Sequence, residues 1–213
     1  MSGLLIVGAG GHGKVVADTA YCVGAWDKIA FLDDRYESLI RVMKWPVLGG
    51  FKQAVDFIED FPDLIVAVGN NTLRVELIKY FAKLGFNIPS LVHPTAFISS
   101  SAKLEPGSVI LAQAGVNADA RVRLGSIINT GATVDHDCIL GEGVHICPGV
   151  HLAGEVLVGN YSWIGVGTSV INQVSIGEKV VIGAGTVIVN DVQSHVTVYG
   201  VPGRVIKSNE VSV

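Results

Sequence analysis

A six-residue repeat of aliphatic side chains occupies the second half of this 213-residue chain. From Val92 to Ile188, all 17 positions at intervals of six hold Val, Ile or Leu. The residue two places earlier is small or β-branched from Ala96 to Ser162. A helix turns every 3.6 residues and cannot place a period of six on one face. Three hexapeptides per circuit instead predict a triangular parallel β-helix whose aliphatic column faces inward, and the pattern leaves the hand of the coil open.

The first 90 residues alternate short apolar runs with helical patterns. Strands are predicted at 4–7, 29–32, 46–48 and 64–68, and helices at 14–24, 51–57 and 73–84. This alternation indicates a parallel sheet with helices packed on it. The sequence therefore predicts two domains: an α/β Rossmann-like half domain over residues 1–90 and an all-β parallel β-helix with a C-terminal tail over residues 91–213.

A glycine-rich segment, Gly8-Ala9-Gly10-Gly11-His12-Gly13, joins the first predicted strand to the first helix. It satisfies the dinucleotide fingerprint, and Asp33 follows the second strand, where a ribose-binding acid would lie. Such a loop lets backbone N–H groups approach a phosphate at a helix N-terminus. Because 90 residues are too few to hold a full dinucleotide, a mononucleotide or a nucleotide sugar fits better, and a tight turn that binds nothing is the alternative. The predicted substrate-binding residues are Gly10, Gly11, His12, Gly13, Asp33, Asp34, Asn70 and Asn71.

Charge and composition disfavour nucleic acids and membranes as partners. A net charge of −4 and a pI near 5.8 disfavour nucleic acid and anionic membranes. The mean hydropathy is high, +0.50, yet no apolar run approaches the roughly 20 residues that span a bilayer, and Met1 to Gly8 lacks the basic start and the cleavage site expected of a secretory signal. Cys22, Cys138 and Cys147 have neither paired nor metal-ligand spacing, which is typical of a reducing compartment. We therefore expect a cytoplasmic protein.

Polar residues concentrate in one stretch of the repeat, 129–137, which contains His136 between two aspartates. His136 follows the inward Val134 by two positions and should project outward, where a carboxylate can fix its tautomer for work as a base. Gly154 lies 18 residues further on, one coil along the same face, and offers space and a backbone N–H. A base beside a backbone donor is what acyl transfer requires. A solvated polar turn is the alternative interpretation.

A second histidine, two cysteines and a tryptophan in the repeat also bear on the chemistry. His145 lies half a coil from His136, so the two can meet only across a subunit boundary. Cys138 occupies a buried corner and Cys147 has no neighbouring base, so neither is expected to be a nucleophile. Trp163, on the coil surface, is a candidate for lining a cofactor groove.

Nine short motifs spread along the chain together carry a resemblance to a known family. They are the Gly8–Gly13 loop, Phe31-Leu32-Asp33-Asp34, Val68-Gly69-Asn70-Asn71, Val92-His93-Pro94, Ile128-Asn129-Thr130, His136-Asp137, His145, Ala153-Gly154 and Gly200-Val201-Pro202-Gly203-Arg204. With these motifs the chain resembles, over nearly its whole length, the bacterial hexapeptide-repeat acetyltransferases of nucleotide-activated amino sugars, the PglD/NeuD-like group. Two positions depart from the family pattern: Asp137 stands where Glu is usual, and Pro202-Gly203-Arg204 where Pro-Ala-Lys is usual.

The resemblance implies a left-handed β-helix, a homotrimer with acetyl-CoA between adjacent subunits, and no metal. It implies His136 as general base, Asp137 as its partner, Asn129 as a further catalytic group and the Gly154 N–H as oxyanion donor. The acceptor it implies is a UDP-, dTDP- or GDP-linked 4-amino-4,6-dideoxyhexose of surface glycan biosynthesis, whose amine attacks acetyl-CoA directly. The implied cofactor contacts are His145, Gly154, Ile164, Gly165, Ala184 and Gly185.

Three other functions fit parts of the sequence less well. A sialic acid O-acetyltransferase would use the same fold, but free sialic acid would leave the glycine-rich loop without a ligand. A zinc hydratase of the γ-carbonic-anhydrase type would need His136, His145 and His151 together, and the six-residue spacing of the last two puts them on different faces of the coil. A non-enzymatic assembly module with a sugar-nucleotide sensor leaves the pairing of His136 with Gly154 without a purpose.

Overall fold

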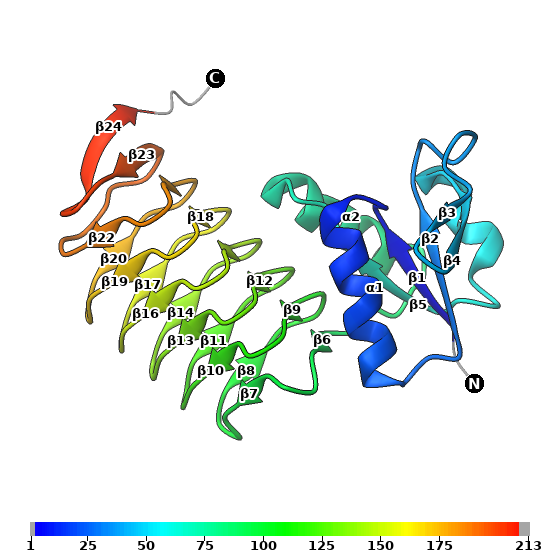
Figure 1. The fold of residues 1–213 in the computed structure, drawn as a ribbon, viewed down its shortest axis with the longest axis horizontal. Coiled ribbons are helices and arrows are strands. Elements are labelled where there is room, and N and C mark those ends of the chain that lie inside the picture. Colours follow the sequence, from blue (N-terminus) through cyan, green and yellow to red (C-terminus); the bar gives the residue numbers. More distant parts are fainter. Residues whose placement is uncertain (1–2, 209–213) are drawn as a thin grey trace. The chain divides into compact units, whose positions relative to one another are not determined.

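The computed structural model describes residues 3–208, and the chain divides into two compact units, Met1–Pro94 and Thr95–Val213. Figure 1 labels the elements of both units. Each unit is described by itself, beginning with the one that carries the glycine-rich loop.

The first unit is an α/β fold around a five-stranded sheet of order β3–β4–β2–β1–β5. The strands β1 (Gly3–Val7), β2 (Lys28–Leu32), β4 (Trp45–Gly49) and β5 (Asp63–Val66) run parallel, and β3 (Arg41–Val42) pairs antiparallel with β4. Helix α1 (Gly11–Val23) packs on β1 and α2 (Asn71–Lys83) on β5. The short strand β6 (Leu91–Val92) ends the unit.

Most predicted elements of this unit are present, with three differences. Helix α1 begins at Gly11, so two of the loop glycines belong to its first turn. The predicted helix at 51–57 is a 3₁₀ helix, η1 (Phe51–Phe57). The β3–β4 hairpin was not predicted, because its turn at Met43 and Lys44 contains none of the Gly or Asn residues that usually mark a two-residue hairpin.

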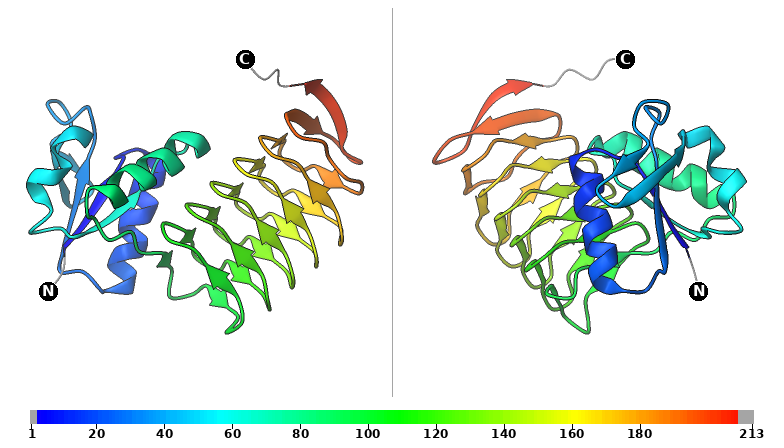
Figure 2. Two further views of the ribbon diagram at one scale, coloured as in Figure 1. Left: turned by 180° about the vertical axis from the view of Figure 1, so that it is seen from behind. Right: turned by 45° about the vertical axis from the view of Figure 1, so that its right-hand side comes forward.

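The second unit is a parallel β-helix of stacked triangular coils, visible from two sides in Figure 2. Strand partners lie 18 residues apart, as in Gly115, Thr133 and His151. The strands of the first face are β7 (Phe97–Ile98), β10 (Gly115–Val116), β13 (Thr133–Val134), β16 (His151–Leu152), β19 (Ser169–Val170) and β22 (Val187–Ile188).

The second face contains β8 (Lys103–Leu104), β11 (Arg121–Val122), β14 (Ile139–Leu140), β17 (Leu157–Val158) and β20 (Ser175–Ile176). The third contains β9 (Val109–Ile110), β12 (Ile127–Ile128), β15 (His145–Ile146), β18 (Trp163–Ile164), β21 (Val181–Ile182) and β23 (Val196–Tyr199). Strand β24 (Arg204–Ser208) folds back antiparallel on β23, so the Gly200–Arg204 motif forms the connecting turn.

The aliphatic column of the repeat forms the core of the coil. From Ile110 to Ile188 every sixth side chain is at most 3% exposed, whereas Val92, Ile98 and Leu104 at the start of the column are half-buried. Removing such side chains from water contributes about 1.5–3 kcal/mol each. The column confirms the inward direction predicted from the repeat, and it fixes which residues of each coil point outward.

The corners of the coil use a left-handed backbone conformation. Glycine supplies it at several corners, such as Gly131 and Gly149, but non-glycine residues adopt it at others. Asp119 (φ 58°), Asp137 (φ 59°) and Glu155 (φ 63°) occupy one corner on successive coils. Asp tolerates this conformation better than most side chains because its short polar group bonds locally.

No helix within residues 3–208 is both long and apolar enough to cross a membrane.

Candidate active site

The predicted base and its carboxylate lie at the corner that follows β13. His136 is half-exposed, and its Nδ1 is 2.8 Å from Oδ2 of Asp137. A carboxylate only accepts, so Nδ1 carries the proton of this bond and Nε2 is left as the basic nitrogen of the neutral ring. The hydrogen bond from the ring to Asp137 raises the pKa of His136, because it favours the imidazolium.

The backbone of the same corner is held by Asp135. Its Oδ1 accepts the His136 N–H at 2.8 Å and Nδ2 of Asn117, one coil earlier, at 2.9 Å. These two bonds lower the pKa of Asp135, which therefore stays ionised near neutral pH. His136 thus bonds one aspartate, Asp137, through its ring and another, Asp135, through its backbone N–H.

Gly154 lies directly against the imidazole, as its 18-residue spacing from His136 predicted. A Cβ at position 154 would overlap the ring of His136, so any larger residue there would force the imidazole out of this position. The next residue, Glu155, donates its N–H to the His136 carbonyl at 2.9 Å. No backbone hydrogen bond among residues 3–208 uses the Gly154 N–H, which leaves this donor available beside the imidazole.

Asn129 and His145 form a second cluster on the third face of the coil. Asn129 Nδ2 is 3.3 Å from His145 Nε2, and His145 stacks on Trp163 with ring centroids 5.0 Å apart. His145 is 8% exposed, whereas Trp163 is 42% exposed. His136 follows a strand of the first face, so within one chain the structure keeps the two predicted halves of the site on different faces.

The remaining predicted cofactor residues lie at the corner after the third face. The Ile164 side chain is 0% exposed and belongs to the core, so only its backbone can meet a ligand. Gly165 is buried, and Ala184 and Gly185 are exposed one coil further on. The Gly185 N–H donates to the Val166 carbonyl at 2.8 Å, which fixes the spacing of these two coils.

Cys138 and Cys147 are buried thiols. Burial raises the pKa of each to about 11, so both are protonated near neutral pH and neither is a ready nucleophile. His145 and His151 lie on different faces, as their spacing predicted. Within the described part of one chain, no group of three or more His, Cys, Asp or Glu residues is arranged to hold a metal ion.

The glycine-rich loop lies at the carboxyl edge of the sheet in the first unit. Gly8 has φ 103° and Gly13 packs against its carbonyl, so both need glycine. Gly10 and Gly11 face open space, and the N-terminus of α1 has no side-chain cap. A cavity of about 350 Å³ lies beside them, lined also by Lys14, Arg35 and Arg41. An anion would meet backbone N–H groups and cations here.

The predicted polar substrate residues mostly serve the protein itself. Asp33 bonds Ala9 and Arg35, and Asp34 accepts the Phe51 N–H at 3.3 Å. Asn70 caps α2 by accepting the Leu73 N–H at 3.0 Å. Burial, reinforced by the charge of Arg74, lowers the pKa of His12 to about 4, so its imidazole is neutral near pH 7.

Sequence reasoning missed Arg74, which organises the turn after β5. Its side chain is fully buried and donates to the Val68 carbonyl at 3.0 Å and to Asn71 Oδ1 at 2.9 Å. Burial lowers the pKa of Arg74 to about 10, so the guanidinium stays charged. Lys14, Arg35 and Arg41 were also missed. The local signals in the sequence were the place of Lys14 directly after Gly13 and that of Arg35 two residues after Asp33.

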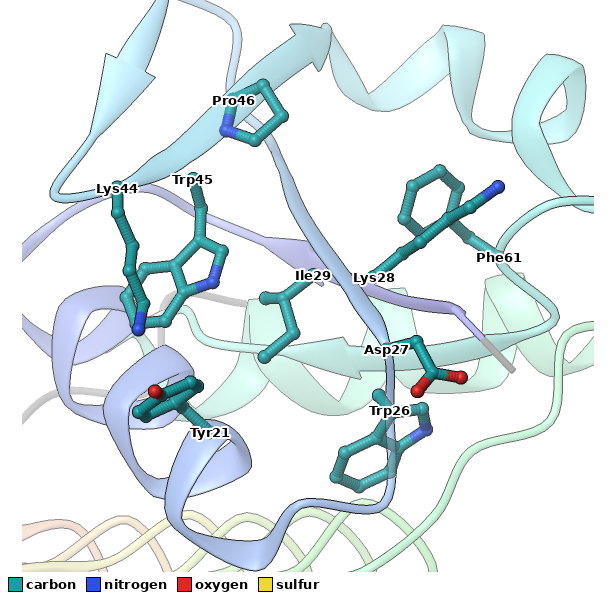
Figure 3. Close-up of a pocket in the computed structure, with 9 residues that line it drawn as sticks. All are labelled: Tyr21, Trp26, Asp27, Lys28, Ile29, Lys44, Trp45, Pro46 and Phe61. Atoms are coloured by element: carbon teal, nitrogen blue, oxygen red, sulfur yellow. The ribbon is translucent and has the colours of Figure 1, made fainter. Parts of the chain in front are cut away.

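A larger cavity, of about 510 Å³, lies at the opposite, amino edge of the same sheet (Figure 3). Aromatic residues dominate its wall, and Lys44 stands over the ring of Tyr21 with its Nζ 3.1 Å from the centroid. None of the residues predicted to bind substrate lines this cavity. The glycine-rich edge is therefore the better candidate for a nucleotide, although its cavity is smaller.

Comparison with known proteins places this geometry in a family. Residues 3–81 match the PglD N-terminal domain. The acetyltransferase domain of PglB from Neisseria gonorrhoeae FA1090, solved with acetyl coenzyme A, is 44% identical with a TM-score of 0.92 over 96% of this chain and 98% of that one. The chain belongs to the PglD/NeuD-like sugar acetyltransferases.

Other members of this family are similar in the same way. PerB from Caulobacter crescentus, solved with CoA and GDP-perosamine, is 37% identical with a TM-score of 0.92 over 97% of this chain and 98% of that one. The UDP-N-acetylbacillosamine N-acetyltransferase of Bacillus subtilis (strain 168) is 36% identical over 114 residues, which span only 52% of its length. These likenesses confirm the predicted fold class, a Rossmann-like half domain followed by a left-handed hexapeptide β-helix.

Proposed function

We propose that this protein transfers the acetyl group of acetyl-CoA to the amino group of a nucleotide-linked 4-amino-4,6-dideoxyhexose. The observation that carries this proposal is the contact of His136, already paired with Asp137, with the backbone of Gly154. Relatives solved with acetyl coenzyme A, or with CoA and GDP-perosamine, support the choice of both substrates. The glycine-rich loop with its neighbouring cations supports a nucleotide-bearing acceptor.

The reaction is a direct acyl transfer. The acceptor nitrogen attacks the thioester carbonyl while His136 Nε2 takes its proton, and the Gly154 N–H donates to the oxygen that becomes negative. The C–S bond then breaks, and the imidazolium returns the proton to the departing CoA sulfur. Asp137 holds the ring in the tautomer that leaves Nε2 basic, and no covalent enzyme intermediate is required.

The proposed active enzyme is a homotrimer with its sites between subunits. His145 and Asn129 lie on a different face from His136 in one chain, and a neighbouring subunit would bring the two clusters together. In this arrangement acetyl-CoA would lie between the β-helices of two subunits. It would be near His145, Trp163 and the corner that contains Gly165, Ala184 and Gly185. The reaction would supply acetylated nucleotide sugars for surface glycans in the cytoplasm.

Release of the CoA thiol tests the activity. Acetyl-CoA would be mixed with the protein and, separately, with UDP-, dTDP- and GDP-linked 4-amino-4,6-dideoxyhexoses and with sialic acid. We expect rapid release with one nucleotide sugar, and release with sialic acid alone would assign O-acetylation instead.

The role of His136 is tested by substitution with a matched control. His136→Ala should lower kcat by about 10²–10⁴. The control is His195→Ala, which removes another histidine paired with a carboxylate, Glu178, at 3.2 Å. The control should keep full activity, and an unchanged rate in His136→Ala would remove that residue from the role of base.

A further inference from the structure

The carboxylate of Asp33 is fully occupied by the protein itself. Its two oxygens accept hydrogen bonds from the Ala9 N–H at 2.9 Å and from Arg35 through N–H, Nε and Nη2 at 3.1, 2.7 and 2.9 Å. A carboxylate offers about four acceptor positions, so none is left for a ribose hydroxyl. The Asp33 side chain is 11% exposed and does not line the neighbouring cavity.

Of the Asp33–Arg35 pair, Arg35 is the residue that lines the cavity. Asp33 binds one edge of the Arg35 guanidinium through Nε and Nη2, which fixes the plane of the group. Nη1 makes no hydrogen bond to Asp33. The Arg35 side chain is 62% exposed and lines the 350 Å³ cavity beside Gly10 and Gly11. The other ionisable side chains on that cavity are Lys14 and Arg41, so all of its charged groups are cations.

We infer that Arg35 binds the diphosphate of the acceptor and that Asp33 is a positioning residue, which acts by holding Arg35 and the Ala9 N–H in place. The inference rests on the proposed function and names the group of the substrate that this site recognises. A diphosphate carries the charge that three cations and open backbone N–H groups favour. The structure thus reassigns Asp33, which the sequence pattern had suggested as a ribose ligand.

Binding of free nucleoside diphosphates tests the assignment without acetyl transfer. UDP, dTDP and GDP would be titrated calorimetrically into the wild-type protein, and the tightest binder into the variants. Arg35→Gln should weaken binding about tenfold to a hundredfold, and Arg35→Lys should weaken it less. Lys44→Gln, which removes a cation from the other cavity, should bind as the wild type does.

The role of Asp33 is separated by two comparisons. Asp33→Asn should weaken binding, yet the double variant should be little weaker than Arg35→Gln, because Asp33 acts through Arg35. The ratio of affinities for the ribonucleoside diphosphate that binds more tightly, UDP or GDP, and for its 2′-deoxy form should be the same in Asp33→Asn and in the wild type. A ratio that falls to one in the variant would show that Asp33 contacts the ribose, and would overturn its reassignment.

The binding experiment distinguishes a failure of the inference on Arg35 from a failure of the proposed function. If the wild type binds a nucleoside diphosphate and Arg35→Gln binds it equally well, the inference is wrong and the proposed function is untouched. If the folded wild type binds none of the three, both the inference and the nucleotide-bearing acceptor are wrong. Circular dichroism of each variant confirms that a loss of binding is not a loss of fold.

Discussion

The pairing of His136 with Asp137 depends on the backbone as much as on the side chains. Asp137 directly follows His136 and adopts φ 59°, and its carboxylate lies 2.8 Å from the imidazole. The short side chain of Asp, in place of the Glu that the resemblance led us to expect, therefore reaches Nδ1.

Asp137→Asn should shift the pH dependence of the reaction. Asp137 raises the pKa of His136, and a general base works only when deprotonated, so under the proposed mechanism the wild-type rate should fall as the pH drops through that raised value. Without the carboxylate the pKa falls, and the acid limb of kcat/KM should move to lower pH. The maximum rate should also fall, because the ring loses its fixed tautomer. Profiles measured from about pH 5 to 9 would show both effects.

Asp119→Asn is the matched control, since Asp119 has φ 58° at the same corner one coil earlier and follows an alanine. It should leave the profile unchanged. An acid limb that stays in place in Asp137→Asn would mean that the carboxylate does not govern the base.

The turn between β5 and α2 depends on one buried cation. Arg74→Met should lower the free energy of unfolding by about 2–4 kcal/mol, because two buried acceptors lose their donor. Denaturant unfolding followed by tryptophan fluorescence in a Trp163→Phe background, which leaves Trp26 and Trp45 as the emitting residues, would report on this unit. Lys83→Met, on the exposed side of the same helix, should change stability by less than about 0.5 kcal/mol. Equal stability of the two variants would contradict the role given to Arg74.

The elements differ in how far the sequence predicts them. The β-helix was predictable because its period is repeated at 17 positions, so no single substitution hides it. The same period predicted the contact of Gly154 with His136. The β3–β4 hairpin was not, since Met43 and Lys44 carry no turn signature.

The side chains around the glycine-rich loop were the least predictable part of the site. Asp33 and Asn70 are common ligand residues, and the sequence cannot show that backbone and cationic groups of the protein already occupy them. Arg74 was missed because an arginine is normally exposed, and its partners become visible only when the turn is folded.

The proposed trimer makes each active site the product of two chains. His136→Ala and His145→Ala should each be nearly inactive alone. If the subunits are dissociated, mixed equally and reassembled, random pairing of neighbours should restore about a quarter of the wild-type sites. Thiol release by the mixed trimers, compared with each variant taken through the same treatment, measures this. Mixtures as inactive as the parents would show that one chain supplies both histidines.

The left-handed corners of the coil link heat tolerance to catalysis. A non-glycine residue in this conformation costs on the order of 1 kcal/mol, so glycine at Gln113, whose corner already holds Gly131 and Gly149 on later coils, would relieve strain and remove no group of the proposed site. The same exchange at position 137 would remove the carboxylate that orients His136. Substitution by glycine can therefore raise the thermal stability of the protein at other coils, but at position 137 it would do so at the expense of the proposed catalysis.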